Sequence, residues 1–225
     1  MSKGSDSVLT THASALRSLG ATQNALPPDL SRARKSLRAE LRAKRRALAP
    51  EARAAAARRV ALEVQRAFFL HPGQRIALYS PLPEELDIAP LAAVIRRHGG
   101  HIYVPRLTDM RHRRMRFVSA SGPMRRNDLG ILEPAGARPI AVRSLDIVFV
   151  PLVGFDARGM RLGMGAGFYD RAFAFRHVRR SWRRPRLVGV AFAVQRVPVI
   201  APAAHDVHLD AIVTEGGVLR CSTGS

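Results

Sequence analysis

Apolar positions recur at helical spacing in residues 27–48 and predict the first helix of the chain. At roughly 100° per residue, one set of apolar side chains falls within a narrow arc and four cations fall on the adjoining flank. The apolar set is Leu30, Ala33, Leu37, Leu41 and Leu48, and the cations are Lys35, Arg38, Arg42 and Arg45. Asp29 or Ser31 can cap this helix. A second helix is predicted from Pro50 to Phe68, because proline suits the first helical turn.

From residue 75 onward, short apolar runs alternate with helical stretches. One such stretch, residues 88–98, starts after Asp87 and ends at Gly99-Gly100, which predicts a helix. Strands are predicted at 75–81, 101–105, 115–118, 146–151, 187–192 and 210–214. Strands that alternate with helices at this spacing predict an α/β fold with a largely parallel sheet.

The two ends of the chain differ from this middle part. Residues 1–27 hold small and polar types without a sustained period, which predicts a disordered N-terminal extension. Their Ser/Thr content, with Asp6 as the only acid, leaves a transit peptide as the alternative. The length of 225 residues suits one domain, placed at 28–215, and residues 216–225 are expected to form a flexible tail.

Cysteine content and hydropathy narrow the cellular class. The lone cysteine, Cys221, cannot build a disulfide framework or a zinc site, so we expect a reducing, cytoplasmic setting. No apolar run reaches the roughly 18 residues that a membrane span needs. No apolar stretch follows Lys3, which argues against a secretory signal.

The charge is strongly positive, with 37 basic residues against 17 acidic ones. Such a surface attracts polyanions, but it also arises from a general arginine bias displayed on solvated faces. Residues 28–66 carry twelve cations against four acids, which is a credible footprint for a phosphate backbone. A basic nucleic-acid-binding protein is therefore the alternative function. No aromatic residue precedes Phe68 in this stretch to stack on bases.

Residues 155–180 contain the most informative chemistry. Gly163, Gly165 and Gly167 alternate after a predicted strand, and an amphipathic helix is expected to begin near Phe168. Exposed backbone N–H groups at a helix start favour a phosphate. Arg161 adds charge, and a carboxylate at Asp170 could hold Mg²⁺ on a nucleotide. A flexible glycine turn before a helix explains the same spacing, and the glycines alone do not decide between the two.

The whole string is more specific than its glycines. G-x-R-L-G-x-G-x-G-x-Y-D-R, at residues 159–171, resembles the signature of the 5-formyltetrahydrofolate cyclo-ligase family. The resemblance runs over roughly residues 30–215. Further blocks match in order: KSLRA at 35–39, YSPLPEELDI at 79–88, LGILEP at 129–134, VPLVGFD at 150–156 and HDVHLDAIVTE at 205–215.

This resemblance implies a fold and an activity. The fold is a single α/β domain, here 28–215, with a mixed, mainly parallel sheet flanked by helices. The activity is conversion of 5-formyltetrahydrofolate to 5,10-methenyltetrahydrofolate, with ATP as co-substrate and Mg²⁺ as cofactor. ATP phosphorylates the formyl oxygen, and N10 of the same folate then attacks. The implied partners are a folate, with or without a polyglutamate tail, and no membrane. We expect a monomer that binds nucleic acid only as a non-specific side activity.

The resemblance also assigns roles to single residues. Arg161 and Tyr169 are the catalytic candidates, and Asp170 and Asp206 are the metal ligands. Substrate binding falls to Ser80, Glu85, Arg38 and Tyr169. Nucleotide binding falls to Lys35, Arg38, Gly159, Arg161, Leu162, Gly163, Met164, Gly165, Ala166, Gly167, Phe168 and Tyr169.

Chemistry alone leaves three of these assignments open. Glu84 is as good a folate ligand as Glu85, and Asp210 could replace Asp206 at the metal. His205 is close enough for proton transfer, but a structural role is the favoured interpretation.

Four positions depart from the family pattern. Phe168 stands where a tyrosine is usual, and Met164, Ala166 and Ile88 also differ. These departures bear on affinity for the pterin more than on the reaction.

Overall fold

The computed structural model describes residues 28–109, 111–121, 124–126, 132–134, 138–178 and 184–221. The extension predicted for residues 1–27 lies outside the described residues, as do residues 129–131 of the LGILEP block. Helices α2 (Pro28–Arg46) and α3 (Pro50–Ala67) confirm both predicted N-terminal helices.

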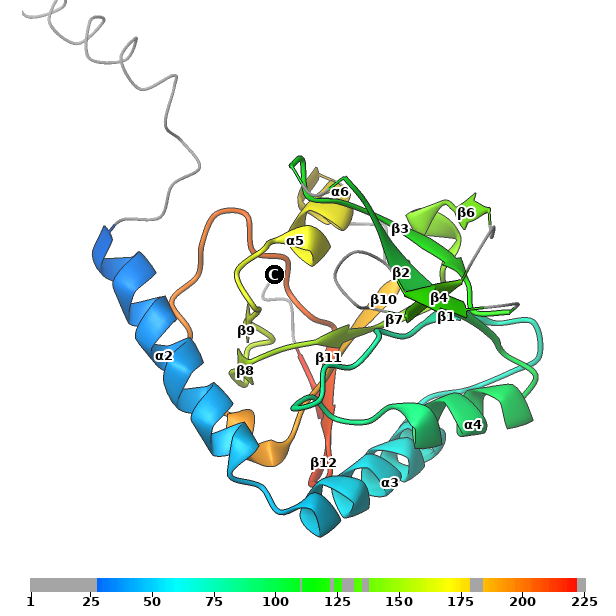
Figure 1. The fold of residues 1–225 in the computed structure, drawn as a ribbon, viewed down its shortest axis with the longest axis horizontal. Coiled ribbons are helices and arrows are strands. Elements are labelled where there is room, and N and C mark those ends of the chain that lie inside the picture. Colours follow the sequence, from blue (N-terminus) through cyan, green and yellow to red (C-terminus); the bar gives the residue numbers. More distant parts are fainter. Residues whose placement is uncertain are drawn as a thin grey trace, which may run out of the picture.

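An eight-stranded sheet forms the centre of the domain (Figure 1), in the order β12-β11-β10-β7-β1-β2-β3-β6. The five strands from β11 to β2 are parallel, whereas β12, β3 and β6 pair antiparallel at the two edges. This arrangement confirms the predicted mixed, mainly parallel sheet. The strands are β1 (Arg75–Ala77), β2 (His101–Asp109), β3 (Arg114–Ser119), β6 (Pro139–Ile140), β7 (Ile147–Pro151), β10 (Arg186–Val190), β11 (Ala211–Thr214) and β12 (Gly217–Arg220).

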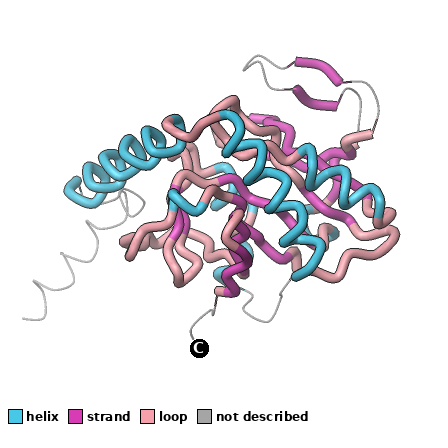
Figure 2. Tube along the Cα trace, turned by 90° about the horizontal axis from the view of Figure 1, so that it is seen from below, coloured by secondary structure: helices cyan, strands magenta, loops and turns pink. Residues whose placement is uncertain are grey.

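Smaller elements connect these strands. Two two-stranded sheets pair β4 (Met124–Arg126) with β5 (Leu132–Pro134) and β8 (Gly154–Phe155) with β9 (Arg161–Leu162). Figure 2 shows β4 and β5 standing apart from the main body. The remaining elements are α4 (Ala89–Arg97), α5 (Phe168–Ala172), α6 (Phe175–Val178) and the 3₁₀ turns η1 (Val142–Ser144) and η2 (Ala193–Gln195).

Two predictions about the C-terminal half are wrong. The flexible tail expected from residue 216 instead contains β12, which pairs with β11 through residues 217–220. The amphipathic helix expected near Phe168 is broken into α5, of five residues, and α6, of four. A turn at residues 173–174 separates them, and the buried Phe173 there packs into the core.

Helices cover both faces of the sheet. Helices α3 and α4 pack on one face, where Val60, Val64, Leu91 and Ile95 meet the apolar residues of the parallel strands. Figure 2 views the molecule from this side, with both helices in front of the sheet. On the other face, residues 168–175 pack with Phe117 and Val148. Both faces of the central strands are therefore buried, as their continuous apolar sequences require.

Helix α2 lies beside these layers and packs on the β8–β9 hairpin and on η2 with the residues that follow it (Figure 1). Leu41 is fully buried there among Val153, Met160, Leu162 and Ile200. The predicted apolar stripe is displaced toward the cationic flank, because Ala33 is exposed whereas Arg34 and Arg45 are buried. The displacement arises because Arg34 pairs with Asp206 and Arg45 pairs with Glu84.

Asp156 fixes the turn between β8 and β9. Its carboxylate is fully buried and accepts hydrogen bonds from the backbone N–H groups of Arg158, Met160 and Ile200. Burial opposes its ionisation, but these N–H groups and the Arg158 guanidinium outweigh that effect and lower the pKa of Asp156. The turn that leads into the glycine-rich segment therefore depends on a buried negative charge.

Among the described residues, no helix combines the length and the hydropathy that crossing a membrane requires.

Leu41→Ala should destabilise the domain by about 2 to 5 kcal/mol, because it empties a fully buried position between α2 and the hairpin. Urea unfolding measures this loss. Leu62→Ala is the matched control on α3, where the side chain is 45% exposed, and it should change stability by less than about 1 kcal/mol. Equal effects of the two substitutions would show that α2 does not pack as described.

Asp156→Asn should lower the free energy of unfolding at pH 7 by about 2 kcal/mol or more, because it removes charge-assisted hydrogen bonds in a buried site. A carboxyl whose pKa is lowered by folding stabilises the protein above its unfolded pKa of about 3.9, and this stabilisation fades as the pH falls through the folded value. The difference between wild type and variant should therefore shrink below about pH 4. Denaturant titrations from pH 7 to pH 3 test this, with Glu40→Gln, in an exposed pair with Lys44, as the control. A difference that stays constant with pH would contradict the ionic role.

Candidate active site

A cavity of about 460 Å³ opens at the carboxyl edge of the parallel strands. It lies over the ends of β1 and β7. From β1 the sheet continues in one direction through β2, β3 and β6, and from β7 it continues in the other direction through β10, β11 and β12. Ligands of open α/β sheets bind at such a switch point. The walls are formed by α2, by the segment after β1, by the β2–β3 hairpin, by residues 163–170 and by residues 205–206.

The glycine-rich segment forms one wall and is open toward the cavity. Gly165 and Gly167 have φ of 101° and 70°, values that side chains rarely adopt. A Cβ on Gly163 would meet nothing within 4 Å, and one on Gly165 would lie 3.7 Å from Cζ of Arg38. The loop therefore presents bare backbone, and the side chains close to it are Arg38, beside Gly165, and Arg113, with Nη1 3.9 Å from a Cβ on Gly167.

Arg38 supplies positive charge at this wall. Its Nε donates to the carbonyl oxygen of Gly163 at 2.8 Å. Its Nη atoms make no hydrogen bond to the residues that the structure describes. Burial, and then the charge of Arg34, lower the pKa of Arg38, although an arginine remains charged at neutral pH. Two sets of charged N–H donors are thus available to an anion beside the loop.

For binding an anion, the positive charge of Arg38 contributes more at this loop than the dipole of the helix that follows it. Helix α5 has only five residues, so it adds few aligned peptide dipoles.

Arg161, which is buried, forms an ion pair with the partly exposed Asp170 at the base of the loop. Nη2 of Arg161 lies 2.5 Å from Oδ1 of Asp170, and Nη1 donates to the carbonyl oxygen of Val207. Oδ1 of Asp170 also accepts from the N–H of Val207 at 3.2 Å. Burial lowers the pKa of Arg161, whereas the negative charge of Asp170 opposes that shift. Asp170 lines the cavity, and its Oδ2 has no hydrogen bond within the described part of the chain.

Asp206 and Asp210 are both occupied by arginines. Asp206 accepts from Nη1 and Nη2 of Arg34 at 2.7 and 3.2 Å, in a pair whose side chains are each 7% exposed. Asp210 pairs through both oxygens with Arg176 at the opposite edge of the sheet. Of the two alternatives for a second metal ligand, Asp210 therefore lies outside the cavity, and Asp206 has no free oxygen.

The described residues contain no group of three or more His, Cys, Asp or Glu side chains that could hold a metal alone. Mg²⁺ usually retains several waters and takes one or two carboxylates together with substrate phosphates. Asp170 Oδ2 fits that smaller requirement, and Asp206 does not.

Glu84 and Glu85 are separated by their surroundings. Glu84 accepts from Arg42, Arg45 and Arg46 on α2, at 3.0, 2.9 and 3.3 Å. Burial opposes ionisation of Glu84, but the hydrogen bonds from Arg42 and Arg45 outweigh it and lower the pKa. Glu84 therefore fastens its loop to the helix.

Glu85 instead lines the cavity. Its Oε2 accepts from the N–H of Leu82 at 3.0 Å, and Arg45 lies 3.9 Å from Oε1. Burial raises the pKa of Glu85, against the opposing effects of the Leu82 N–H and the Arg45 charge. This carboxylate faces the ligand space with capacity to accept further hydrogen bonds, so the geometry favours Glu85 over Glu84.

Two tyrosines complete the cavity. The hydroxyl of Tyr79 donates to the carbonyl oxygen of Leu86 at 2.8 Å. Burial, followed by the charge of Glu85, raises the pKa of both Tyr79 and Tyr169. Their hydroxyls stay protonated near neutral pH, so Tyr169 can donate a hydrogen bond but is a poor base.

Most predicted nucleotide and substrate positions line this cavity, but three do not. Ser80, Arg38, Glu85, Arg161 and residues 163–170 are in its wall, and so is His205. Lys35 is exposed on α2 outside the wall. Gly159 and Leu162 are buried in the hairpin, where a Cβ on Gly159 would lie 2.7 Å from the carbonyl oxygen of Leu209.

Sequence reasoning missed part of the wall. The inward position of Arg34 was not predicted, because the helical projection assigned the buried face from apolar residues alone. The β2–β3 hairpin offers no motif, since its contribution comes from ordinary apolar positions on two strands. The missed residues are Arg34, Tyr79, Leu82, Pro105, Leu107, Met115 and Pro151.

The cations of the two N-terminal helices are mostly engaged. Nine of the twelve make ion pairs or hydrogen bonds within the described chain, and Arg32, Lys35 and Arg58 are the three for which none is found there. A phosphate backbone would have to replace these internal partners. This reduces the footprint on which the nucleic-acid alternative depends.

Comparison with known proteins agrees with the motif blocks. The family model for the 5-formyltetrahydrofolate cyclo-ligase family matches residues 30–215. The 5-formyltetrahydrofolate cyclo-ligase of Escherichia coli K12 is 31% identical over 184 residues, covering 79% of this chain and 98% of that protein. The mouse protein of the same name is 27% identical over 191 residues, covering 81% and 94%.

A solved structure supports the same relationship. The 5,10-methenyltetrahydrofolate synthetase of Aquifex aeolicus superposes with a TM-score of 0.66 at 28% identity, over 85% of this chain and 94% of that one. The match to the family model covers most of the chain, including every segment that lines the cavity. The chain is therefore a member of the 5-formyltetrahydrofolate cyclo-ligase family.

Proposed function

We propose that this chain converts 5-formyltetrahydrofolate to 5,10-methenyltetrahydrofolate with consumption of ATP. The observation that carries the proposal is that one cavity brings the open glycine loop and the uncommitted Nη donors of Arg38 together with the buried acceptor Glu85. The glycine loop and Arg38 can bind a triphosphate, and Glu85 can accept from the amino and N3–H donors of a pterin. The volume of about 460 Å³ lies within the range of ligand sites.

The proposed reaction uses the cavity for positioning and for charge neutralisation. The formyl oxygen of an amide is a poor leaving group, and transfer of the γ-phosphoryl group to it forms an iminium phosphate. N10 of the same folate then attacks the formyl carbon, loses its proton, and phosphate departs to leave the methenyl bridge. Attack within one molecule benefits from a high effective concentration. Phosphoryl transfer itself depends mainly on orientation and electrostatics.

In this proposal each polar group of the cavity has one task. Arg38 and the N–H groups of residues 163–167 hold the phosphates, and Lys35, from outside the cavity wall, reaches the outer phosphate. Arg161 adds positive potential below the loop while it orients Asp170. Tyr169 donates a hydrogen bond, and Ser80 and Glu85 hold the folate. Asp170 would hold Mg²⁺ together with ATP, and the ion would supply positive charge to neutralise the phosphates.

The direct test is to follow the absorbance of methenyltetrahydrofolate after adding 5-formyltetrahydrofolate, with and without ATP and Mg²⁺. We expect product only when both are present. Absence of product with ATP and Mg²⁺, in protein whose melting curve shows a folded state, would refute the proposal.

Glu85→Gln should raise the KM for 5-formyltetrahydrofolate by about tenfold or more, because it removes a charged acceptor from the cavity. The KM for ATP should change little. Burial raises the pKa of Glu85, so this carboxylate takes up a proton earlier as the pH is lowered. The wild-type KM for folate should therefore begin to rise, on acidification, at a pH above the ordinary glutamate pKa of about 4.3. Glu84→Gln is the matched control and should lower the melting temperature without this change in KM. The proposal fails here if the Glu84 variant alone loses folate affinity.

Arg38→Ala should raise the KM for ATP by about tenfold or more, because the charge that it removes lies beside the loop. Lys35→Ala should have a smaller effect, since this side chain is exposed outside the cavity wall. Steady-state kinetics with each substrate varied separates the two. If Lys35→Ala has the larger effect on ATP, the nucleotide lies along the outer face of α2 instead.

Asp170→Asn should raise the Mg²⁺ concentration for half-maximal turnover by about tenfold, because it weakens a charged oxygen ligand. It also leaves Arg161 without its counter-charge, so the melting temperature should fall. Asp206→Asn breaks a comparable buried pair with Arg34 and serves as the control. It should lower the melting temperature but leave the Mg²⁺ requirement unchanged. The opposite pattern would assign the metal to Asp206.

A further inference from the structure

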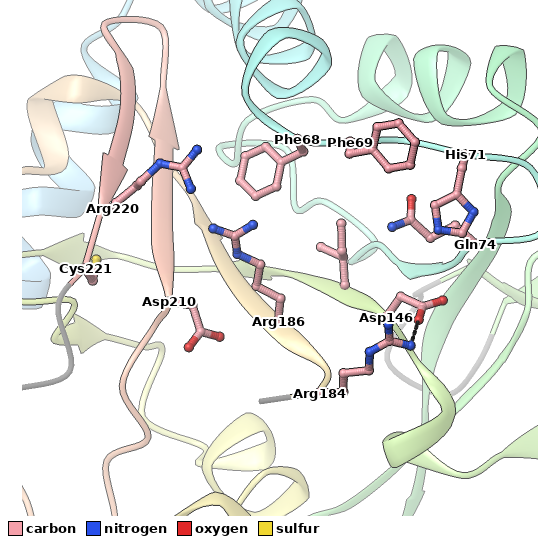
Figure 3. Close-up of a pocket in the computed structure, with 11 residues that line it drawn as sticks. Phe68, Phe69, His71, Gln74, Asp146, Arg184, Arg186, Asp210, Arg220 and Cys221 are labelled. Atoms are coloured by element: carbon pink, nitrogen blue, oxygen red, sulfur yellow. Dashed lines mark hydrogen bonds and ion pairs between the residues drawn. The ribbon is translucent and has the colours of Figure 1, made fainter. Parts of the chain in front are cut away.

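A second cavity, of about 540 Å³ (Figure 3), lies at the amino edge of the parallel strands. The candidate active site lies at the opposite edge. It is formed where α3 ends, where β1, β7, β10 and β11 begin and where the antiparallel strand β12 ends. The two cavities share no lining residue. A ligand here would not occupy the site proposed for ATP and folate.

The acidic groups of this second cavity are already neutralised. Asp146 accepts from Arg184 at 2.9 Å and from the N–H of Arg75, and Asp210 is paired with Arg176 at 2.6 Å. Arg186 and Arg220 have no carboxylate partner among the described residues. The cavity therefore carries two cations in excess of its internal pairs, which matches the charge of a phosphate dianion.

These two cations lie close to an aromatic wall. The Arg186 guanidinium sits over the ring of Phe68, with Cζ 4.9 Å from the centroid. Figure 3 shows the guanidinium groups of Arg186, on β10, and Arg220, on β12, both directed toward Phe68; β11 lies between these two strands. Stacking on the ring orients the Arg186 fork and leaves its N–H donors for an anion.

A buried amide faces the opposite side of the cavity. Gln74 is 7% exposed, and its Oε1 has no hydrogen-bond partner within the described structure. Figure 3 shows this amide beside His71 and directed into the cavity. Buried polar groups in native proteins are nearly always paired, so an unpaired one points to a ligand that supplies a donor.

An uncovered aromatic surface lies next to that amide. Phe69 is 84% exposed, and its ring lies 5.8 Å from the ring of His71 at an angle of 36°. Exposed phenylalanine of this kind is a platform for another planar ring. The cavity thus combines two cations without carboxylate partners, a hydrogen-bond acceptor and a stacking surface.

We propose that this cavity is a second ligand site, for a phosphate ester of mononucleotide size that also carries an aromatic ring. The phosphate binds Arg186 and Arg220, the ring stacks on Phe69 and His71, and an amino or hydroxyl group of the ligand donates to Gln74. Phosphate is favoured over a single carboxylate because two guanidinium groups are available. The proposal does not rest on the folate reaction, since none of these residues lies in the candidate active site.

Calorimetric titration with AMP tests this proposal in the full chain. Because AMP could also enter the candidate active site, the reference protein carries Arg38→Ala, which removes the phosphate-binding charge there. Added to this background, Arg220→Ala and Arg186→Gln should each weaken AMP binding by about tenfold or more. Arg58→Ala is the matched control, since it removes the same charge from an exposed arginine of α3 for which no ion pair is found in the described chain. It should leave the affinity unchanged.

Two further ligands and one further variant separate the contributions. Ribose 5-phosphate, which lacks the ring, and adenosine, which lacks the phosphate, should each bind at least tenfold more weakly than AMP. Phe69→Ala should weaken AMP but not ribose 5-phosphate. Because Arg220 and Phe69 are exposed, their substitution should not disturb the melting temperature.

Three results would overturn the proposal. The first is undetectable binding of AMP to the reference protein. The second is equal binding of AMP by the Arg220, Arg186 and Arg58 variants, which would indicate a diffuse cationic surface. The third is AMP binding that wild type shows and the Arg38→Ala reference loses, which would place AMP in the active site only. None of these results depends on turnover of folate.

Discussion

The buried ion pairs of helix α2 are the constraint on which the geometry of the cavity depends. Leu41 is the only leucine of this helix that is fully buried, whereas Arg34 and Arg45 reach inward to Asp206 and Glu84. A buried charge that loses its partner is costly, so these pairs hold three distant segments at fixed separations. The cavity lies between α2, the loop after β1, the loop before β11, residues 163–170 and the β2–β3 hairpin. Its outline is therefore set by charge pairing as much as by apolar packing.

The same constraint divides the carboxylates of the site into two kinds. Asp206 and Glu84 have their oxygens committed to arginines of α2, so they shape the walls. Asp170 and Glu85 each keep acceptor capacity toward the cavity. Sequence position does not reveal this division, because Glu84 and Glu85 are adjacent and Asp206 lies in a matching motif block. What separates them is which residues α2 brings opposite each oxygen.

The sequence predicted the fold better than it predicted the wall of the site. Apolar runs located β7, β10 and β11 within one or two residues, because strands buried on both faces need unbroken apolar sequence. The inward direction of Arg34 was not accessible, since a helical projection ranks positions by hydropathy and ignores a partner far along the chain. The strand β12 was missed because GGVLR is short and follows directly on a predicted strand. Its stability comes from pairing with β11, which is a tertiary property.

The excess of arginine over lysine gains a physical meaning from these positions. Arg34, Arg45 and Arg161 are each at most 6% exposed, and every one of them lies beside a carboxylate. A lysine in such a place can lose its proton when burial penalises the charge, whereas an arginine keeps its charge and offers a fork of donors to both oxygens. The two lysines within the described chain, Lys35 and Lys44, are both exposed. Part of the positive charge is therefore structural, and it was never available to an external polyanion. Within the two cavities, the cations without a carboxylate partner among the described residues are Arg38 at one edge of the sheet and Arg186 and Arg220 at the other.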